Sequence, residues 1–466
     1  MNRLEELLYR CAPYPIQNLL LSAYGAYLKS IRYGSAYLQS LESLAGMEDA
    51  SSEQIERCQE EKLNQIVRGA IASVPYYKSK YMHLLRSKEH FTRHNLAQHF
   101  PILEKRYVKD HLGDFRSEAV SPSRCVTVFT SGTTGSPLEV TATKRAVAEN
   151  FAFFSNFLKS NKLDPFAWSV TFGGRLILPK SQSRPPFWRC NYAMRTWLFS
   201  SYHIAESNIA AYLAQLERIQ PTYIDSYPSS IYAIARYIVE RKVVHSVRPS
   251  AIVTSSEVLT FQQRQIIQEA FNCPVIDQYG SAEMVVFAQQ CSFGSYHVHP
   301  LYGVTEIVDE HGATCKSGQI GDLVVTGLIN DAMPLLRYRI GDSAAFRELP
   351  CPCGSCFPAL EGILGRNDDY IVTPEGNHVG RLDPLFKGLR GIIEAQVIQE
   401  SIEELEVLVV PGDGFGDTAR QKLVSSIRDR VGAGIEINVR LVESIPRGAN
   451  GKFRTVISRV KRASLQ

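Results

Sequence analysis

Short β-branched runs alternate with stretches of helical periodicity between about residues 120 and 345. The run Tyr223-Ile224-Asp225 precedes a helical stretch at 229–241, and a similar run at 251–253 precedes another at 261–271. Strands separated by helices pair as parallel neighbours, because the connection must carry the chain back across the sheet. The pattern predicts an α/β domain of packed layers around a largely parallel sheet.

The N-terminal part of the chain has a different pattern. Residues 1 to about 100 are predicted to be mostly helical, as an extension of the α/β domain. Ser51 and Gln54 have the spacing of a capping box. Apolar residues at helical spacing follow them, namely Ile55, Leu63, Ile66, Ala70 and Ile71.

The C-terminal part is predicted to be a separate, compact α+β domain, with strands at 392–397, 404–410 and 435–442 and a helix at 418–431. A chain of 466 residues is too long for one ordinary core, so we expect more than one domain. The predicted boundary lies near Gly365. It separates a large domain of residues 1–364 from a small, mobile one of residues 365–466.

Composition excludes several classes of protein. The formal net charge of +4 is small for this length and gives no reason to expect nucleic acid as a partner. No run of about 18 apolar residues occurs, so a transmembrane segment is not expected. The N-terminus lacks the basic start and apolar block of a secretory signal. Ten scattered cysteines do not form a dense secreted framework, and we expect a cytoplasmic protein with reduced thiols.

The amphipathic, tyrosine-rich segment 16–28 leaves two interpretations open. It can form a helix that packs on the main body of the protein, or a helix that makes peripheral contact with a membrane.

Residues 130–137 form a loop that is dense in hydroxyls and glycines and directly follows the run 126–129. Such a loop can wrap polyphosphate oxygens with its backbone N–H groups, although the same composition also occurs in ordinary turns. The Walker pattern G-x-x-x-x-G-K-[ST] does not occur in the chain. Neither G-x-S-x-G nor H-E-x-x-H occurs, so the simplest hydrolase and zinc-protease interpretations are excluded.

Four further motifs follow this loop in order, at 277–283, 338–342, 364–369 and 445–452. The ordered set of five resembles the adenylate-forming superfamily, which includes the acyl-CoA synthetases, the peptide-synthetase adenylation domains and the luciferases. Most of that superfamily has a lysine where this chain has Leu138. The phenylacetate–CoA ligase-like branch resembles this chain at that position and along residues 64–77, particularly its members associated with capsule or surface-polysaccharide clusters.

The resemblance implies that the protein activates a small-molecule carboxylic acid with ATP and Mg²⁺, forming an acyl-adenylate and releasing pyrophosphate. A second step would transfer the acyl group to CoA, to a carrier-protein thiol or to an amine. The alternative is a non-catalytic nucleotide-binding homologue that acts as a scaffold, for example in surface-polysaccharide assembly.

The resemblance also implies roles for single residues. The β- and γ-phosphates would be held by the loop, through Thr130, Ser131, Gly132, Thr133, Thr134 and Gly135. Adenine would stack on Tyr279 beside Gly280 and Ser281, while Asp342 would bind the ribose hydroxyls and Glu283 would bind Mg²⁺.

The remaining implied residues surround the reaction itself. Ser256 and Glu257 would lie near the α-phosphate, and Lys452 would reach that phosphate and the attacking carboxylate. Arg366 would act in the hinge region with Asp368, at which the small domain rotates between the two half-reactions. Tyr202 or His203 could line the acyl pocket or gate a thiol channel, but a hydrogen-bonded core histidine is an equal alternative.

Cysteines cluster in the segment Cys351-Pro352-Cys353-Gly354-Ser355-Cys356, and Cys291, His297 and His299 lie upstream. Thiolates and imidazole suit a tetrahedral structural zinc. Some phenylacetate–CoA ligase-like proteins resemble this arrangement. The ligands that we expect are Cys291, His297, Cys351 and Cys353, with Cys356 and His299 left open. The alternative is a set of reduced thiols in a turn.

Overall fold

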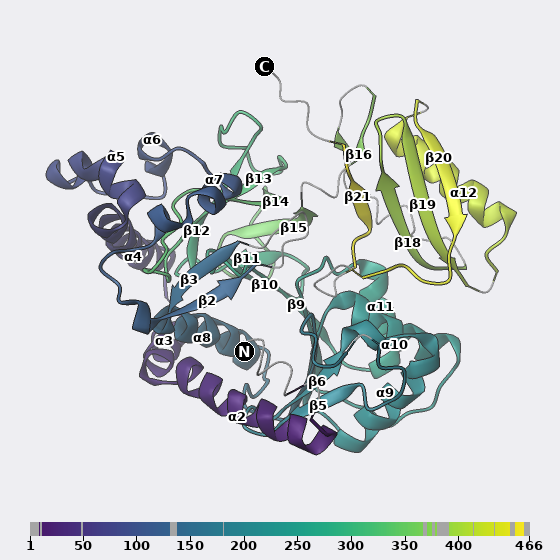
Figure 1. Cartoon of the computed structure of the whole chain (residues 1–466). Helices are drawn as coiled ribbons and strands as arrows, with labels where there is room; N and C mark the ends of the chain where they lie inside the picture. Colours follow the sequence, from purple (N-terminus) through teal and green to yellow (C-terminus); the bar gives the residue numbers. More distant parts are fainter. Residues whose placement is uncertain are drawn as a thin grey trace. The chain divides into compact units, whose positions relative to one another are not determined.

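The computed structural model describes residues 9, 12–47, 50–130, 138–179, 181–366, 371–374, 378–379, 391–412, 414–432, 434–447 and 453–460 (Figure 1). The chain divides into two compact units, which are described separately below. The first comprises Met1–Leu259 with Gln263–Ile363, and the second comprises Thr260–Gln262 with Leu364–Gln466. Among the helices so described, none combines the length and the apolarity needed to cross a bilayer.

Helices dominate the first hundred residues, as predicted: α2 (Tyr14–Arg32), α3 (Ser35–Ala45), α4 (Ser52–Ser73), α5 (Pro75–Arg86) and α6 (Leu96–His99). The capping box at the start of α4 is confirmed. The Ser51 side chain accepts the Gln54 backbone N–H, and the Gln54 side chain accepts the Ser51 backbone N–H. The predicted apolar face of α4 is also the buried one, since Leu63, Ala70 and Ile71 have no exposed surface.

The first unit contains one large sheet with parallel and antiparallel strands. Its parallel part lies where strands and helices alternate along the chain. It comprises β6 (Thr196–Ser200), β4 (Ser169–Gly173), β7 (Tyr223–Ser226), β8 (Ala251–Ser255) and β9 (Val275–Gly280). The helices between these strands are α9 (Glu206–Ile219), α10 (Pro228–Glu240) and α11 (Phe261–Phe271). The two predicted strand-to-helix units at 223–241 and 251–271 are therefore present.

The rest of this sheet is antiparallel, so the expectation of a largely parallel sheet was wrong for that part. The antiparallel pairs involve β5 (Trp188–Asn191), β10 (Phe287–Gln290), β11 (Tyr296–Val298), β12 (Gly303–Val308), β13 (Gly321–Gly327), β14 (Tyr338–Phe346) and β15 (Ala359–Arg366). Beyond β9, the described part of the chain has no helix between these strands, and short connections favour antiparallel neighbours.

A separate antiparallel hairpin consists of β2 (Cys125–Phe129) and β3 (Glu139–Thr143). The chain continues from β3 into α8 (Lys144–Ser160). Before the hairpin in the sequence, the short strand β1 (Leu103–Glu104) pairs in parallel with β14 and leads directly into α7 (Lys105–Asp110).

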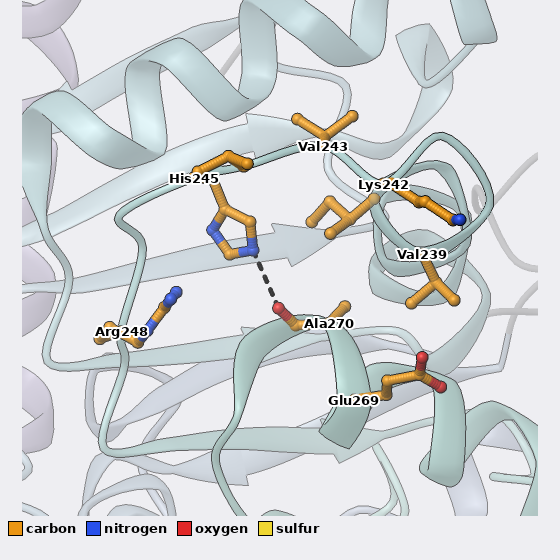
Figure 2. Close-up of a pocket in the computed structure, with 9 residues that line it drawn as sticks. Val239, Lys242, Val243, His245, Arg248, Glu269 and Ala270 are labelled. Carbon is orange, nitrogen blue, oxygen red and sulfur yellow. Dashed lines mark hydrogen bonds between the residues drawn. The ribbon is translucent and has the colours of Figure 1, made fainter.

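A hollow of about 330 Å³ lies at the amino-terminal edge of the parallel strands (Figure 2). It is lined by the segment between α10 and β8, including Lys242, His245 and Arg248, and by Glu269 near the end of α11. The sequence motifs at 254–257 and 277–283 include the last residues of β8 and β9, so they lie at the carboxyl edge of the parallel strands, opposite the hollow. Open α/β sheets bind ligands at the carboxyl edge, so this hollow is not the candidate site.

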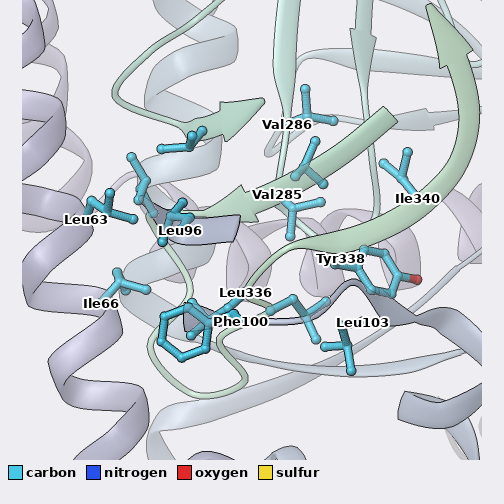
Figure 3. Close-up of a cluster of buried hydrophobic side chains, with 14 of the residues drawn as sticks. Leu63, Ile66, Leu96, Phe100, Leu103, Val285, Val286, Leu336, Tyr338 and Ile340 are labelled. Atoms are coloured by element: carbon cyan, nitrogen blue, oxygen red, sulfur yellow. The ribbon is translucent and has the colours of Figure 1, made fainter. Parts of the chain in front are cut away.

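One buried cluster joins the helical extension to the antiparallel strands (Figure 3). Leu63 and Ile66 of α4 pack in it with Val285, Val286 and Tyr338. The cluster therefore fixes the start of β14 and the turn before β10 against α4.

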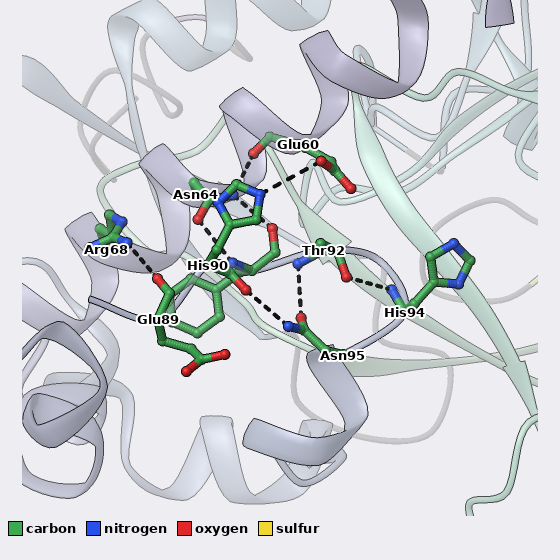
Figure 4. A network of polar contacts seen from close by, with 9 residues as sticks. Glu60, Asn64, Arg68, Glu89, His90, Thr92, His94 and Asn95 are labelled. Carbon is green, nitrogen blue, oxygen red and sulfur yellow. Dashed lines mark hydrogen bonds and ion pairs between the residues drawn. The ribbon is translucent and has the colours of Figure 1, made fainter. Parts of the chain in front are cut away.

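Polar contacts hold segment 89–95 on α4 (Figure 4). The Asn64 side chain donates to the Phe91 carbonyl at 2.7 Å and accepts the Phe91 N–H at 3.0 Å. Asn95 accepts the Thr92 N–H at 2.8 Å and donates to the His90 carbonyl at 2.9 Å. Since this segment leads into α6 and β1, the network fixes the path of the chain toward Lys105.

The second unit is a small α+β domain. Its four-stranded sheet has the order β20–β19–β18–β21, formed by β20 (Glu436–Leu441), β19 (Glu404–Pro411), β18 (Ile392–Gln399) and β21 (Val456–Ser458). A further helix, α12 (Asp417–Val431), contributes Leu423 and Ile427 to the core of this unit. A two-stranded pair, β16 (Ile371–Val372) with β17 (His378–Val379), completes the described part.

Candidate nucleotide site and cysteine cluster

Tyr279 lies at the carboxyl end of β9, where the parallel part of the sheet ends. Its ring is half-buried and its hydroxyl donates a hydrogen bond to the Asp342 carboxylate on β14. These two residues, separated by 63 positions, were predicted to bind the adenine and the ribose of one nucleotide. The structure brings them into direct contact, with Gly280 exposed beside them.

Glu283 follows Tyr279 in the turn before β10, and its side chain is only 5% exposed. Its Oε1 accepts hydrogen bonds from the Lys105 ammonium at 2.9 Å and from the Tyr338 hydroxyl at 3.0 Å. A buried carboxylate needs such partners, because leaving it unpaired would be costly. The arrangement is an anionic oxygen ligand with a cation beside it, next to the Tyr279–Asp342 pair.

Sequence reasoning missed Lys105 and Tyr338 as site residues. The pairing of β1 with β14 aligns Leu103 with Tyr338, and so places Lys105 near the start of β14. One signal was available in the sequence: the resemblance implies a lysine where this chain has Leu138, so a search for another cation near the loop was justified. No spacing rule pointed to a residue 178 positions from Glu283.

A buried carboxyl group supports the strand that carries Tyr279. Asp277 accepts hydrogen bonds from the hydroxyls of Thr254 and Tyr296. Burial raises the pKa of Asp277 to about 6, although both hydrogen bonds oppose the rise. Asp277 thus ties β8 and β11 to β9 just before the nucleotide motif.

The Ser281 hydroxyl is buried, and among the residues that the structure describes it has no hydrogen-bond partner. A buried polar atom without a partner is uncommon in a folded protein. Ser281 lies between Tyr279 and Glu283 in the sequence. A ligand bound beside these two residues would supply the missing hydrogen-bond partner.

Ser256 and Glu257 follow β8 at the same carboxyl edge. Ser256 has a φ of +71°, in the left-handed region that residues other than glycine seldom adopt. The Glu257 carboxylate accepts the Ser229 N–H at 2.9 Å and the Ser229 hydroxyl at 3.0 Å. Glu257 therefore caps the first turn of α10, and its predicted contact with nucleotide stays a prediction.

Thr130 is the described end of the hydroxyl-rich loop. Its N–H donates to the Leu138 carbonyl at 3.0 Å, and its hydroxyl accepts the Leu138 N–H at 2.9 Å. Leu138 is fully buried in the same cluster as Tyr338, so the base of the loop is fixed in that core. The residues Ser131, Gly132, Thr133, Thr134 and Gly135 lie outside the described residues.

Three predicted residues of the C-terminal region have no described side chain. Arg366 ends β15, but only its backbone is described, and Asp368 and Lys452 lie outside the described residues. Their roles in the hinge and at the α-phosphate stay predictions.

His203 is a hydrogen-bonded core residue. Its Nδ1 lies 2.7 Å from the Ser200 hydroxyl, and its Nε2 lies 3.1 Å from the Pro179 carbonyl. The ring stacks on Phe187 with the centroids 5.3 Å apart. Tyr202 differs, because its half-buried hydroxyl donates to the Gly174 carbonyl at 2.9 Å, in the loop that follows β4.

The structure also brings together the four predicted zinc ligands. Cys291 follows β10, His297 lies on β11, and Cys351 and Cys353 lie between β14 and β15. Their ligand atoms all lie within 4.8 Å of one another. The Cys291 and Cys351 sulfurs are 3.6 Å apart, and the Cys353 sulfur is 3.2 Å from His297 Nε2. Three thiolates and one imidazole at these separations fit a tetrahedral zinc.

The surroundings of this cysteine–histidine cluster also fit a metal. His297 Nδ1 lies 3.1 Å from the Phe357 carbonyl, an acceptor that orients the ring with Nε2 toward the cysteines, as in a metal ligand. The Cys353 backbone N–H lowers the pKa of Cys351 to about 6, which favours the thiolate that binds a metal. Burial raises the pKa of Cys353 to about 11, so its thiolate would need the charge of a bound cation. Cys356 is exposed and His299 is buried, and neither is part of this group.

The chain is similar to known proteins over nearly its whole length. Residues 371–459 match the family described as the CapK C-terminal domain. The chain is 28% identical to Protein CapK of Staphylococcus aureus over 97% of this chain and 99% of that protein. It is 24% identical to the phenylacetate-coenzyme A ligase of Thermus thermophilus over 88% of this chain and 98% of that one.

Among solved structures, 2-hydroxyisobutyryl-CoA ligase in the postadenylation state, in complex with 2-HIB-AMP, has the same fold. The TM-score is 0.68 at 20% identity, over 87% of this chain and 90% of that one. The fold is thus that of an adenylate-forming CoA ligase. Together with the homology to CapK and to the phenylacetate–CoA ligases, this fold supports the phenylacetate–CoA ligase-like branch of the adenylate-forming superfamily.

Proposed function

We propose that this protein is an AMP-forming ligase that activates a carboxylic acid with ATP. A carboxylate oxygen of the substrate attacks the α-phosphorus, and the bond from that phosphorus to the bridging oxygen of the β-phosphate breaks. Pyrophosphate leaves with that bridging oxygen, and an acyl-adenylate forms. A thiolate or an amine then attacks the acyl carbon, and AMP leaves.

The observation that carries the proposal is the contact set at the carboxyl edge of β9. Tyr279 bonds Asp342, and four residues later Glu283 bonds Lys105 and Tyr338, so both carboxylates are tied to β14. A carboxylate suits the hydroxyls of a ribose, and a hard oxygen ligand suits Mg²⁺ bound to phosphates. Phosphoryl chemistry of this kind depends on positioning and on neutralising charge, which these groups supply.

Lys105 supports the proposal from the N-terminal side. We propose that its ammonium takes the place of the lysine that most of the wider superfamily carries after the loop proline, where this chain has the buried Leu138. A lysine at position 138 would have to bury its charge in the core. Lys105 has a side chain that is 34% exposed, so it can exchange Glu283 for a phosphate oxygen.

Lys452 and Arg366 complete the proposed catalytic set. Lys452 would neutralise the charge that develops between the substrate carboxylate and the α-phosphate, and Arg366 would act at the hinge. The support for these roles is the match of their motifs to the family, together with the homology over nearly the whole chain.

We propose CoA or a carrier-protein thiol as the acceptor, with an amine as the competing class, and the cytoplasm as the location. The names of the relatives support a CoA thioester most directly, since two of them are CoA ligases. The similarity to CapK along the full length supports a place in capsule or surface-polysaccharide biosynthesis.

We also propose that the cysteine–histidine cluster of Cys291, His297, Cys351 and Cys353 holds a structural zinc. Four protein ligands leave no open position, so the metal would fix the loop between β14 and β15 onto the β10–β11 hairpin.

The experiment is ATP-dependent pyrophosphate release across aryl, fatty, amino and sugar acids, with and without CoA. Release with one acid, lost in Lys452→Ala and kept in Lys422→Ala, supports the proposal and identifies the substrate. Lys422 is an exposed lysine on α12 and serves as the matched control. ATP binding without release from any acid would instead support a non-catalytic nucleotide-binding scaffold.

A further inference from the structure

The outward face of α2 is apolar over about three turns. Large side chains at three- and four-residue spacing are exposed on it: Ile16 (47%), Leu19 (64%), Leu20 (44%), Tyr24 (41%) and Tyr27 (54%). This spacing places them on one side of the helix. A contiguous apolar face of this kind is uncommon on a soluble protein without a partner.

Over the middle of the same helix the inward face is the polar one, while Tyr14 and Ile31 near its ends pack on apolar clusters. The residues of α2 that are buried are Gln17, Asn18 and Gly25. Asn18 accepts the Cys190 N–H at 3.0 Å, and the Ser22 hydroxyl accepts the Tyr192 N–H at 2.9 Å. The polarity of α2 is therefore reversed relative to an ordinary surface helix.

The reversal follows from what α2 covers. It packs on β5, which is the last strand of the sheet in this direction and so has unpaired backbone groups along its outer side. Side chains of α2 satisfy those groups, and Gln17 also bonds the Arg189 side chain. At Gly25, a Cβ would come within 2.2 Å of Asn191 Oδ1, so the helix is closely seated. Turning the apolar face inward would leave the edge of β5 without these partners.

Aromatic and basic groups border the apolar face. Tyr192 is 55% exposed and Trp168 is 40% exposed, and their ring centroids are 6.4 Å apart. No Asp or Glu occurs between residues 12 and 41, whereas Lys29 is exposed in the last turn of α2. Arg32, in the same turn, packs on the ring of Phe151 and is only partly exposed. Tyrosine and tryptophan suit the boundary between water and lipid, and basic residues suit anionic headgroups.

We propose that α2 docks on a phospholipid bilayer with anionic headgroups. The lipid-facing surface consists of Ile16, Leu19, Leu20, Tyr24, Tyr27, Tyr192 and Trp168. The aliphatic side chains enter the acyl boundary, the aromatic rings lie at the level of the headgroups, and Lys29 lies beside the anionic phosphates. The role is independent of the reaction proposed above, and it would hold the protein at a membrane surface.

Charge favours lipid over a second copy of this chain. In a two-fold dimer the same patch faces itself. The facing segment would bring a second exposed Lys29 and no acidic residue, so Lys29 would gain a like charge as its neighbour. Anionic headgroups supply the opposite charge.

Vesicle flotation of the full chain tests the proposal. Phosphatidylcholine vesicles with and without about 30% phosphatidylglycerol are compared, a content that gives a negative surface. We expect binding to the anionic vesicles, about tenfold weaker in the double variant Leu19→Glu with Tyr27→Glu. The matched control is Val244→Glu with Leu349→Glu, since these side chains are 97% and 73% exposed elsewhere on the chain. Lys29→Gln should weaken binding to the anionic vesicles alone.

Each outcome of the experiment has a defined meaning. Thermal unfolding of every variant confirms that the fold is retained. Absence of the wild-type protein from floated anionic vesicles overturns the proposal, as does equal binding of the two double variants. A dimer in sedimentation velocity that dissociates in the Leu19/Tyr27 variant, without vesicle binding by the wild type, would assign the face to a second copy.

Discussion

The hydroxyl of Tyr279 donates its hydrogen bond to the carboxylate of Asp342 across 63 positions of sequence. The hydrogen bond fixes the carboxylate beside the ring on which we propose that adenine stacks. A group that binds a ribose must be oriented relative to the base, and this contact supplies the orientation.

Asp342→Asn should raise the KM for ATP by about 10- to 100-fold, because the variant loses the negative charge and one of the two acceptor oxygens that would bind the ribose hydroxyls. Tyr279→Phe keeps the ring and should cost only about threefold to tenfold. The measurement is pyrophosphate release at varied ATP concentration. Equal effects of the two substitutions would contradict separate roles for the ring and the carboxylate.

Lys105→Ala should lower kcat/KM for ATP by about 100-fold, because a cation beside the phosphates is removed and Glu283 loses its charged partner. Arg106→Ala is the control on the same helix, since the Arg106 side chain is 93% exposed. Steady-state kinetics with both variants checks the prediction. If the two variants behave alike, Lys105 has no part in binding phosphate.

Purified protein should contain about one zinc per chain, and Cys353→Ser should lose it and unfold several degrees lower. Cys356→Ser should keep the metal, because Cys356 lies outside the cysteine–histidine cluster. Metal content by mass spectrometry and Tm by calorimetry are the measurements. A metal-free protein with an unchanged Tm in both variants would show that the cysteines are ordinary reduced thiols.

Asp277→Asn should change how stability depends on pH. Burial raises the pKa of Asp277 to about 6 from an ordinary value of 3.8, so between these values the folded state keeps a proton that the unfolded state has released. This preference stabilises the fold at low pH and is lost as the pH rises through about 6.

The asparagine variant should therefore gain Tm relative to the wild type as the pH rises from about 4 to 7, by roughly 5 °C. Thermal unfolding at several pH values gives the comparison. Parallel curves for the two proteins would show that Asp277 does not titrate in this range.

The sequence by itself determined the class of protein and much of the local structure. Periodicity predicted α4 with its capping box, and the alternation of strands and helices predicted β7, α10, β8 and α11, because these features depend on residues close together in the chain. The motifs predicted Tyr279, Glu283 and Asp342 in one site on the strength of family resemblance. The structure shows the contact of Tyr279 with Asp342, and it joins Glu283 to Tyr338 at the start of the same strand as Asp342.

The tertiary structure alone decided which distant groups meet. Lys105 reaches Glu283 only because β1 pairs with β14, and local spacing carries no information on that pairing. The direction of α2 was equally undecidable from its sequence, since a polar stripe and an apolar stripe are both present. The open edge of β5 requires hydrogen-bond partners, so the polar stripe turns inward and the apolar stripe is left exposed.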